Sequence, residues 1–529
     1  MVQQATPELP LPLGYGIHGF DSGDRHDLSS LSRIHAAKFC QPPGCAIVIQ
    51  YRLNRQERTM HVDECDHDYR IGSFGDLRRE RAGARIFERV VTTGSLVLCK
   101  VGSGRAGEVS ASRFFGSAAV TPEEILTTAG RRTAAACSGR RIVAAHDTTE
   151  INFSGRDRRR KGLGKAGDGK SLGYFCHGMV AIDADDEALL GVVHAHIWTR
   201  SSDKLKPRRD RPIEDKESIR WIEATNVAAD VLGGAAQLIV VGDREFDIYS
   251  QFARRPDGVE LIVRAAQNRK LADEEWLFEV PSDWHELGVM DVRVPPKRPG
   301  DPGRVAQVTV KAGRVCIRKP RHGASATDTE TVTLTYVEVN EPDPPKGHER
   351  ITWRLLTTLP VVGEIDEFAA AQEIVRLYRL RWRIEQIFRA MKSDGLRIEE
   401  TQVRDVHRLF NLTAIAITAA ARTIQLVDAR DGSSRPATDV ADQDIIAAAK
   451  AIGPTLEGKT ERQRNPHEAG SLAWLAWIVA RLGGWNCYYK PPGPKTMRAG
   501  WTELAAMAVG YAMARLQQGH VIDPVQQNA

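Results

Sequence analysis

Residues 378–392 read YRLRWRIEQIFRAMK. At about 100° per residue, Tyr378, Arg381, Glu385 and Lys392 fall within roughly 60° of one another on a helical projection. The apolar residues of the stretch occupy the neighbouring sector, so the pattern predicts one amphipathic helix with a polar face beside its core face. A carboxylate set among cations and a phenol suits a metal ion next to a phosphate chain. A solvated surface helix shows the same pattern, so this stretch needs support from elsewhere in the chain.

Two apolar runs upstream each end in an acid. Residues 141–146, RIVAAH, precede Asp147, and residues 238–242, LIVVG, precede Asp243. Each run predicts a buried strand that delivers a carboxylate at its end. Acids at such junctions also cap helices in ordinary α/β domains, so neither is informative alone. The two acids together with Glu385 predict a site where three carboxylates converge.

In these blocks the sequence resembles the DDE transposases of the insertion sequence four family, whose best-known member moves transposon five. The family's first acid lies in an Asp-Thr-Thr block, here residues 147–149, and its second in Asp-Arg-Glu-x-Asp-Ile, here residues 243–248. Its third lies in a signature of Tyr, Arg, Glu and Lys whose spacing residues 378–392 match without departure. Shorter blocks also agree, including Lys216-Glu217-Ser218 before Trp221.

The resemblance implies an α/β fold with a ribonuclease-H-like (retroviral-integrase-like) catalytic core. Residues 136–257 and 363–400 would form this core, and residues 258–362 a β-rich insertion. Val- and Ile-rich runs between turns rich in Pro, Gly and Lys independently predict strands in the insertion.

Helical domains are expected to flank the core. By resemblance, residues 73–135 would bind the transposon end, and residues 401–529 would form a helical C-terminal region that joins two subunits. The Gly-rich stretch 93–109 departs from a helical pattern. Residues 1–72 are punctuated by Pro and Gly and are unlike the family, so we interpret them as a disordered extension or as translation from a start codon placed too early.

The resemblance also implies the chemistry of the three acids. Asp147, Asp243 and Glu385 would be the catalytic residues and would hold two Mg²⁺ ions, for which Mn²⁺ can substitute. Three carboxylates in one site repel each other unless divalent cations lie between them, and oxygen ligands favour these ions. The expected reaction is cut-and-paste transposition by hydrolysis and transesterification of phosphodiester bonds at the transposon ends.

The expected partners are inverted-repeat DNA at the transposon ends, target DNA and a second copy of the chain. Phosphates would be held by Tyr378, Arg381, Arg389 and Lys392, with Arg264 as a weaker candidate. Trp353 or Trp382 could stack on a displaced base, although packing explains such aromatics equally well.

Overall composition adds little to this hypothesis, but local composition adds more. The net charge of the 529 residues is only +5. Cations cluster within residues 156–165, 204–211 and 318–321, and phosphate contacts need such clusters. A charge run is usually a solvated loop, and we favour DNA contact only for the first cluster.

The cysteines and the apolar stretches indicate where in the cell the protein is expected. The eight cysteines form no CxxC pair, which is typical of reduced thiols in a cytoplasmic protein. By resemblance the protein would be bacterial and associated with the nucleoid. The apolar stretch 409–427 is interrupted by Asn411 and Arg422, so we expect a buried helix and no membrane span.

Two alternative functions remain open from the sequence. One is a catalytically impaired DNA-binding relic that inhibits transposition, which the unusual N-terminal residues favour. The other is a metal-dependent nuclease of related fold that never joins strands.

Overall fold

A computed structural model describes residues 70–153, 160–166, 171–200, 211–294, 303–393, 395–430, 432–433, 435–488 and 490–519. The larger of two compact units comprises Tyr69–Val292 and Val305–Ala529 and holds the elements below, apart from the last residues of β7 and the first of β8. The N-terminal extension expected over residues 1–72 lies outside the described residues, except for 70–72.

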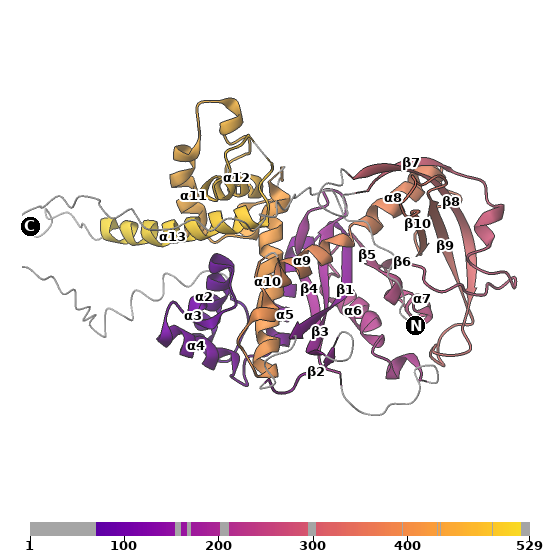
Figure 1. Cartoon of the computed structure of the whole chain (residues 1–529), viewed down its shortest axis with the longest axis horizontal. Coiled ribbons are helices and arrows are strands. Elements are labelled where there is room, and N and C mark those ends of the chain that lie inside the picture. The colour runs from indigo at the N-terminus through magenta and orange to yellow at the C-terminus, as the bar shows by residue number, and fades with distance from the viewer. Residues whose placement is uncertain are drawn as a thin grey trace, which may run out of the picture. The chain divides into compact units, whose positions relative to one another are not determined.

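The described strands form a single sheet in the order β2-β3-β1-β5-β6-β10-β9-β8-β7, with β4 also paired to β3 (Figure 1). The strands are β1 (Arg141–Phe153), β2 (Gly164–Ala166), β3 (Ser171–Asp183), β4 (Leu189–Trp198), β5 (Gln237–Gly242), β6 (Val259–Arg264), β7 (Gly288–Val294), β8 (Arg304–Arg318), β9 (Thr331–Asn340) and β10 (Thr352–Thr357).

The central strands of this sheet are buried and rich in β-branched residues. β1 pairs antiparallel with β3 and parallel with β5, which in turn pairs parallel with β6. Ile142 and Val143 on β1, like Ile239 and Val240 on β5, are fully buried, as is typical of strands covered on both faces. β6 falls in the predicted insertion and also pairs antiparallel with β10. The strands of the insertion therefore continue the sheet of the core.

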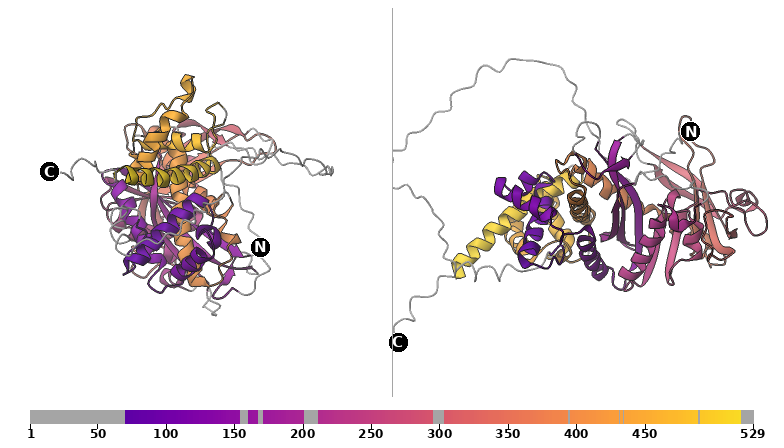
Figure 2. Two further views of the ribbon diagram at one scale, coloured as in Figure 1. Left: turned by 90° about the vertical axis from the view of Figure 1, so that its left-hand side faces the viewer. Right: turned by 90° about the horizontal axis from the view of Figure 1, so that it is seen from below.

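Helices surround the sheet and extend beyond it. The α-helices are α2 (Leu77–Thr93), α3 (Leu98–Val101), α4 (Arg105–Phe115), α5 (Pro122–Cys137), α6 (Ile219–Val231), α7 (Tyr249–Ala253), α8 (Glu367–Arg379), α9 (Trp382–Lys392), α10 (Val406–Ala429), α11 (Gln443–Leu456), α12 (Leu472–Leu482) and α13 (Pro494–Gly519). Short 3-10 helices are η2 (Ile213–Asp215), η3 (Arg244–Phe246), η4 (Val280–Asp283), η5 (Ile398–Glu400), η6 (Ala437–Asp439) and η7 (Glu461–Gln463). Figure 2 shows the N-terminal helices, in indigo, beside the C-terminal helices, in yellow, and α13 packs on α2.

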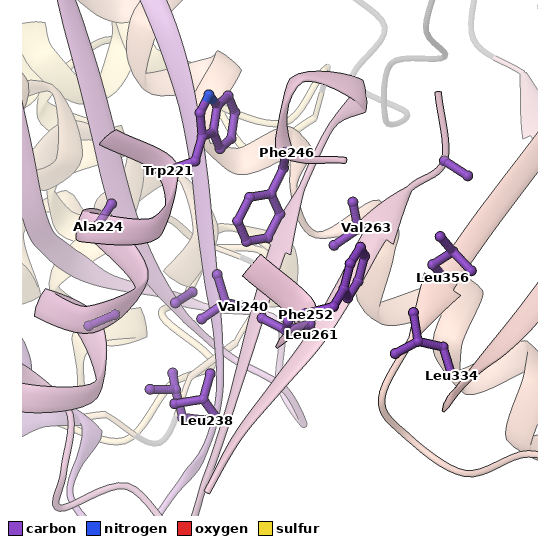
Figure 3. Packing of buried hydrophobic residues seen from close by; sticks show 14 of the residues in the cluster. Trp221, Ala224, Leu238, Val240, Phe246, Phe252, Leu261, Val263, Leu334 and Leu356 are labelled. Atoms are coloured by element: carbon purple, nitrogen blue, oxygen red, sulfur yellow. The ribbon is translucent and has the colours of Figure 1, made fainter. Parts of the chain in front are cut away.

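The two faces of β1 contact different helices, because side chains alternate along a strand. Ile142 and Ala144 belong to a hydrophobic cluster that includes Trp221 of α6 and Phe246 of η3. The rings of Trp221 and Phe246 stack with centroids 5.5 Å apart, and Figure 3 shows them in this cluster. On the opposite face, α9 packs on β1 and β3. Asp147 belongs to this second face.

The long helix α10 packs against helices from both the N-terminal and the C-terminal parts of the described chain. It packs against α2, α4, α5, α9, α12, α13 and strand β4. Asn411 is fully buried and donates hydrogen bonds to the carbonyls of Phe115 and Val120, which join α10 to the α4–α5 segment. By length and composition α10 could cross a membrane, but 89% of its most apolar window is buried within the protein. This agrees with the expected buried helix.

The Gly-rich stretch 93–109 is more helical than its sequence predicts. It contains α3 and the start of α4. Gly102 and Gly107 lie so close that a Cβ on Gly107 would fall 1.9 Å from the carbonyl oxygen of Gly102. The glycines allow two short helices to meet backbone to backbone, which a periodicity argument does not detect.

The predicted signature helix is in fact two helices. α8 ends at Arg379 and α9 begins at Trp382, so Tyr378 lies on a different helix from Glu385. Leu380 and Arg381 keep right-handed helical dihedrals, but their N–H groups bond to carbonyls three residues back. The expectation of a single helix was wrong, because a tightened joint of this kind leaves the spacing of residues almost unchanged.

Candidate active site

The sheet register brings the first two acids to the same level. The parallel pairing of β1 with β5 ends where Ala145 faces Val241, and Asp147 and Asp243 each lie two residues further on. β5 ends at Gly242, directly before Asp243, whereas β1 continues through Asp147 to Phe153, so the prediction that this strand ends at Asp147 was wrong. The parallel register still places the two acids at the same level of the sheet. Oδ1 of Asp147 accepts the N–H of Thr148 at 2.7 Å, and Oδ1 of Asp243 accepts the N–H of Glu245 at 2.8 Å.

The third acid approaches the first from α9. Glu385 lies in the first turn of the helix, and its Oε1 accepts a hydrogen bond from Nη2 of Arg381 at 2.8 Å. Nη1 of the same guanidinium lies 3.1 Å from Oδ2 of Asp147. Arg381 therefore links the first and third acids, and only 4% of its side chain is exposed, compared with 19% for Asp147 and 25% for Glu385.

A glycine lets α9 approach the sheet at this point. Gly178 on β3 is the antiparallel partner of Asp147. A Cβ at this position would lie 2.9 Å from Ile417, 3.3 Å from Phe388 and 3.4 Å from Ile384. The absence of a side chain at Gly178 thus sets the depth at which α9, and with it Glu385, packs.

Burial and the neighbouring acids both change the pKa of Asp147. Its burial raises its pKa well above the usual range, and the nearby charge of Asp243 raises it further. Arg381 lowers the pKa again, while Glu385 raises it. The net effect favours the protonated acid, so an ionised Asp147 needs more positive charge than Arg381 supplies.

The donor set suits a divalent metal ion, although it is not closed around one. Three carboxylates whose charges oppose each other's ionisation would be relieved by a cation, and hard oxygen ligands match Mg²⁺ or Mn²⁺. Within the residues that the structure describes, no group of three or more His, Cys, Asp or Glu side chains lies close enough to hold a metal as placed. The chemistry of the three acids therefore fits such an ion.

Arg220 joins the segments that follow the first two acids, a role that the sequence did not indicate. Its Nε donates to Oγ1 of Thr148 at 3.2 Å, and its Nη2 lies 2.9 Å from Oε2 of Glu245. A further bond goes to the carbonyl of Glu217 at 2.8 Å. The block Lys216-Glu217-Ser218 before Trp221 was the available signal, since Arg220 lies just beyond it.

Two buried histidines lie beside Thr148, and one of them contacts its hydroxyl group. Nδ1 of His177 lies 2.9 Å from Oγ1 of Thr148, and its Nε2 lies 3.3 Å from Nδ1 of His146. Burial lowers the pKa of both histidines well below its usual value, so both imidazoles are neutral at pH 7. They pack against Trp221, which makes this a structural layer and not a source of protons.

The other residues predicted to bind phosphate differ in how far they are buried and in what they contact. Tyr378 is 6% exposed, with its ring centroid 6.5 Å from that of Trp353, and Arg264 is 7% exposed on β6. Arg389 is exposed on α9. Nζ of Lys392 lies 3.5 Å from Oε1 of Glu399, so it is paired in this structure.

The described parts of the basic clusters also differ. Arg160 donates to the carbonyls of Thr401 and Val403, whereas Lys161 and Lys165 are exposed. The rest of that cluster, and residues 204–210 of the second, lie outside the described residues. In the third cluster, Arg318 pairs with Glu274 and Lys319 with Glu330.

The second aspartate of the Asp-Arg-Glu-x-Asp-Ile block is structural. The side chain of Asp247 is fully buried, pairs with Arg269, and accepts the N–H groups of Ala266 and Gln267, each at 2.8 Å. It fixes the segment that follows β6.

Residues 223–422 match a family model described as "Transposase DDE domain". The match supports a DDE transposase. It runs from α6 into α10 and includes Asp243 and Glu385, whereas Asp147 precedes it and is brought to them by β1. A transposase domain of this kind implies a ribonuclease-H-like core, an enzyme that acts on DNA, the binding of DNA ends and the use of divalent metal ions.

Proposed function

We propose that this chain is the transposase of an insertion sequence of the insertion sequence four family and moves its element by cut and paste. Hydrolysis would free a 3′-hydroxyl at the element's end, and that hydroxyl would then attack a phosphodiester bond of the target DNA. The convergence of three acids from three separate elements supports this proposal, with Arg381 linking Asp147 to Glu385.

Asp147, Asp243 and Glu385 would be the catalytic residues and would hold two Mg²⁺ ions, with Mn²⁺ as a substitute. Two such ions, when bound, supply the positive charge that activates an attacking oxygen and stabilises a leaving one. The chain itself fixes the carboxylates. The backbone N–H groups of Thr148 and Glu245 each orient one aspartate, and α9 carries Glu385 rigidly in its first turn.

The phosphates of the transposon end and the target would be held by Tyr378, Arg381, Arg389, Lys392 and Arg264. The exposure of Arg389, one turn beyond Glu385 on α9, supports this role. Lys392 would exchange its pairing with Glu399 for a DNA phosphate. Charge-assisted bonds from such cations position the backbone without reading the base sequence.

The flanking helices would supply recognition and assembly. Residues 73–135 would bind the inverted repeats, and residues 401–529 would pair two copies in a synaptic complex. Exposed apolar side chains near the end of α13 support the second role, since Val509 is 58% exposed and Met513 is 61% exposed. The protein would act in the bacterial cytoplasm at the nucleoid.

Cleavage of the element's own ends tests this function. Purified protein is incubated with Mg²⁺ and DNA that carries the inverted repeats flanking its gene, beside Glu385→Gln and Asp257→Asn. Asp257 is an exposed acid in the turn before β6, so its variant controls for the loss of one negative charge. We expect breaks at the repeat ends with wild type and Asp257→Asn, and rates at least about 10³-fold lower with Glu385→Gln.

The products distinguish the proposed function from its alternatives. Strand joining into a target plasmid supports a transposase, and cleavage without joining would indicate a nuclease. Specific binding of the repeats without metal-dependent cleavage would indicate an inhibitory relic.

A further inference from the structure

The position of Arg381 suggests a role beyond contact with DNA. Its guanidinium makes bonds of 3.1 and 2.8 Å to Asp147 and Glu385, and it is almost completely buried. These are two of the three carboxylates that would hold metal ions. A cation of the chain itself therefore pairs with the oxygens that a metal ion would need.

We propose that Arg381 competes with divalent metal for the site. In the metal-free protein the guanidinium bonds to both Asp147 and Glu385 and holds them near each other, and it leaves one or both when metal binds. This inference rests on the proposed function, because it takes these acids to be metal ligands. It assigns Arg381 a positioning role in the resting protein.

The surroundings of Arg381 make this competition effective. The residue lies at the joint between α8 and α9, at the N-cap position of α9, where its backbone is held by bonds to and from neighbouring turns. Its planar fork can serve two carboxylates at once, which a single ammonium group cannot do equally well. Separating a buried guanidinium from its acids is costly, so metal has to displace a strong partner.

Metal binding in the absence of DNA tests the proposal without any catalytic turnover. Mn²⁺ is titrated by isothermal calorimetry into wild type, Arg381→Gln and Arg389→Gln. A paired cation lowers the affinity of a carboxylate for a proton by a factor of roughly 10 to 1000, and it should oppose the binding of a metal cation in the same way. We therefore expect Arg381→Gln to bind Mn²⁺ at least about tenfold more tightly than wild type.

Arg389→Gln is the matched control for charge. It removes one positive charge from the same helix at an exposed position, where screening is strong. We expect its Mn²⁺ affinity to change by about twofold or less, because exposed charges interact weakly. An equal gain in both variants would show that net charge alone sets the affinity and would overturn the proposal.

Thermal unfolding gives a second readout. In EDTA, Arg381→Gln should melt at a lower temperature than wild type, because the two acids lose their shared partner. Mn²⁺ should then raise its melting temperature more than it raises that of wild type. If Arg381→Gln does not fold, Arg381→Lys serves instead, with an affinity for Mn²⁺ that exceeds that of wild type by a smaller factor.

The outcomes separate this inference from the proposed function. Mn²⁺ binding to wild type with no gain in Arg381→Gln or Arg381→Lys would overturn the role of Arg381 alone. Failure of wild type and variants to bind Mn²⁺ would overturn the metal site itself.

Discussion

The burial of Asp147 lowers the free energy of unfolding when this acid is ionised. Burial and the charge of Asp243 raise its pKa, and Arg381 offsets this only in part. In the unfolded chain the pKa would return to about 3.8. Between these two values the folded state binds more protons than the unfolded state, so the free energy of unfolding decreases as the pH rises through that window.

Replacing Asp147 with Asn should therefore stabilise the metal-free protein at neutral and higher pH. The gain should be about 1.4 kcal/mol for each unit by which folding raises the pKa, less the loss of the Arg381 pair. Denaturant unfolding in EDTA at several pH values measures it. The advantage of Asp147→Asn should shrink as the pH falls toward 4, where both proteins carry a neutral side chain. A variant less stable than wild type across the whole range would contradict this account.

At the residue scale, the sequence pointed to three acids but not to the side chains that they contact. Asp147, Asp243 and Glu385 were visible because each closes an apolar run or interrupts an amphipathic one. The double pairing of Arg381 was not visible, since helical spacing relates Arg381 to Glu385 but says nothing of a strand far upstream. The hydrogen bonds of Arg220 to Thr148 and Glu245 could not be predicted either, because these residues are distant from Arg220 in the sequence.

At the element scale, the packing of α9 depends on the missing side chain at Gly178. Gly178→Val should place methyl groups against Ile384, Phe388 and Ile417 and push α9 away from β1. We expect a loss of about 1–3 kcal/mol in the free energy of unfolding, as is typical of overpacked cores, together with weaker Mn²⁺ binding. Urea unfolding and calorimetry measure the two effects.

Gly510 provides a control for this substitution. It lies in α13 with open space around the position of a Cβ. Gly510→Ala should raise the free energy of unfolding by about 0.5–1 kcal/mol, because alanine restricts the unfolded chain and favours the helix. If Gly178→Val were as stable as wild type, α9 would have to accommodate the new side chain without moving.

The joint between α8 and α9 shows where prediction from periodicity fails at this scale. Apolar residues keep their spacing through Leu380 and Arg381, so the projection predicted one helix. Only the bonding pattern changes, as N–H groups shift to carbonyls three residues back. Such a change alters the direction of a helix without altering the sequence pattern.

At the scale of the whole molecule, the three acids come from distant parts of the chain, and the pairing of β1 with β5 and the packing of α9 on β1 relate them to one another. The local patterns predicted β1, β5 and the presence of strands in the insertion. They could not predict that β6 pairs with both β5 and β10, because pairing between distant strands leaves no local signal. Metal binding should therefore be linked to global unfolding.

Mn²⁺ at about 100 times its dissociation constant should raise the free energy of unfolding by about 2.7 kcal/mol. Glu385→Gln should lose most of this gain, since it removes a ligand while keeping the size of the side chain. Denaturant unfolding with Mn²⁺ and with EDTA measures the difference. An equal gain in wild type and in Glu385→Gln would mean that Mn²⁺ binds elsewhere on the folded protein.

The central position of α10 affects the order in which the protein can be made. The helix covers α9, contacts Gly178 through Ile417, and holds the α4–α5 segment through Asn411. All of these elements leave the ribosome before α10 does. A growing chain that already contains the three acids still lacks the helix that packs α9 against the sheet. Synthesis must therefore pass Ala429 before α9 can pack as it does in the finished fold, so an unfinished chain lacks the arrangement that places Glu385 beside Arg381 and Asp147.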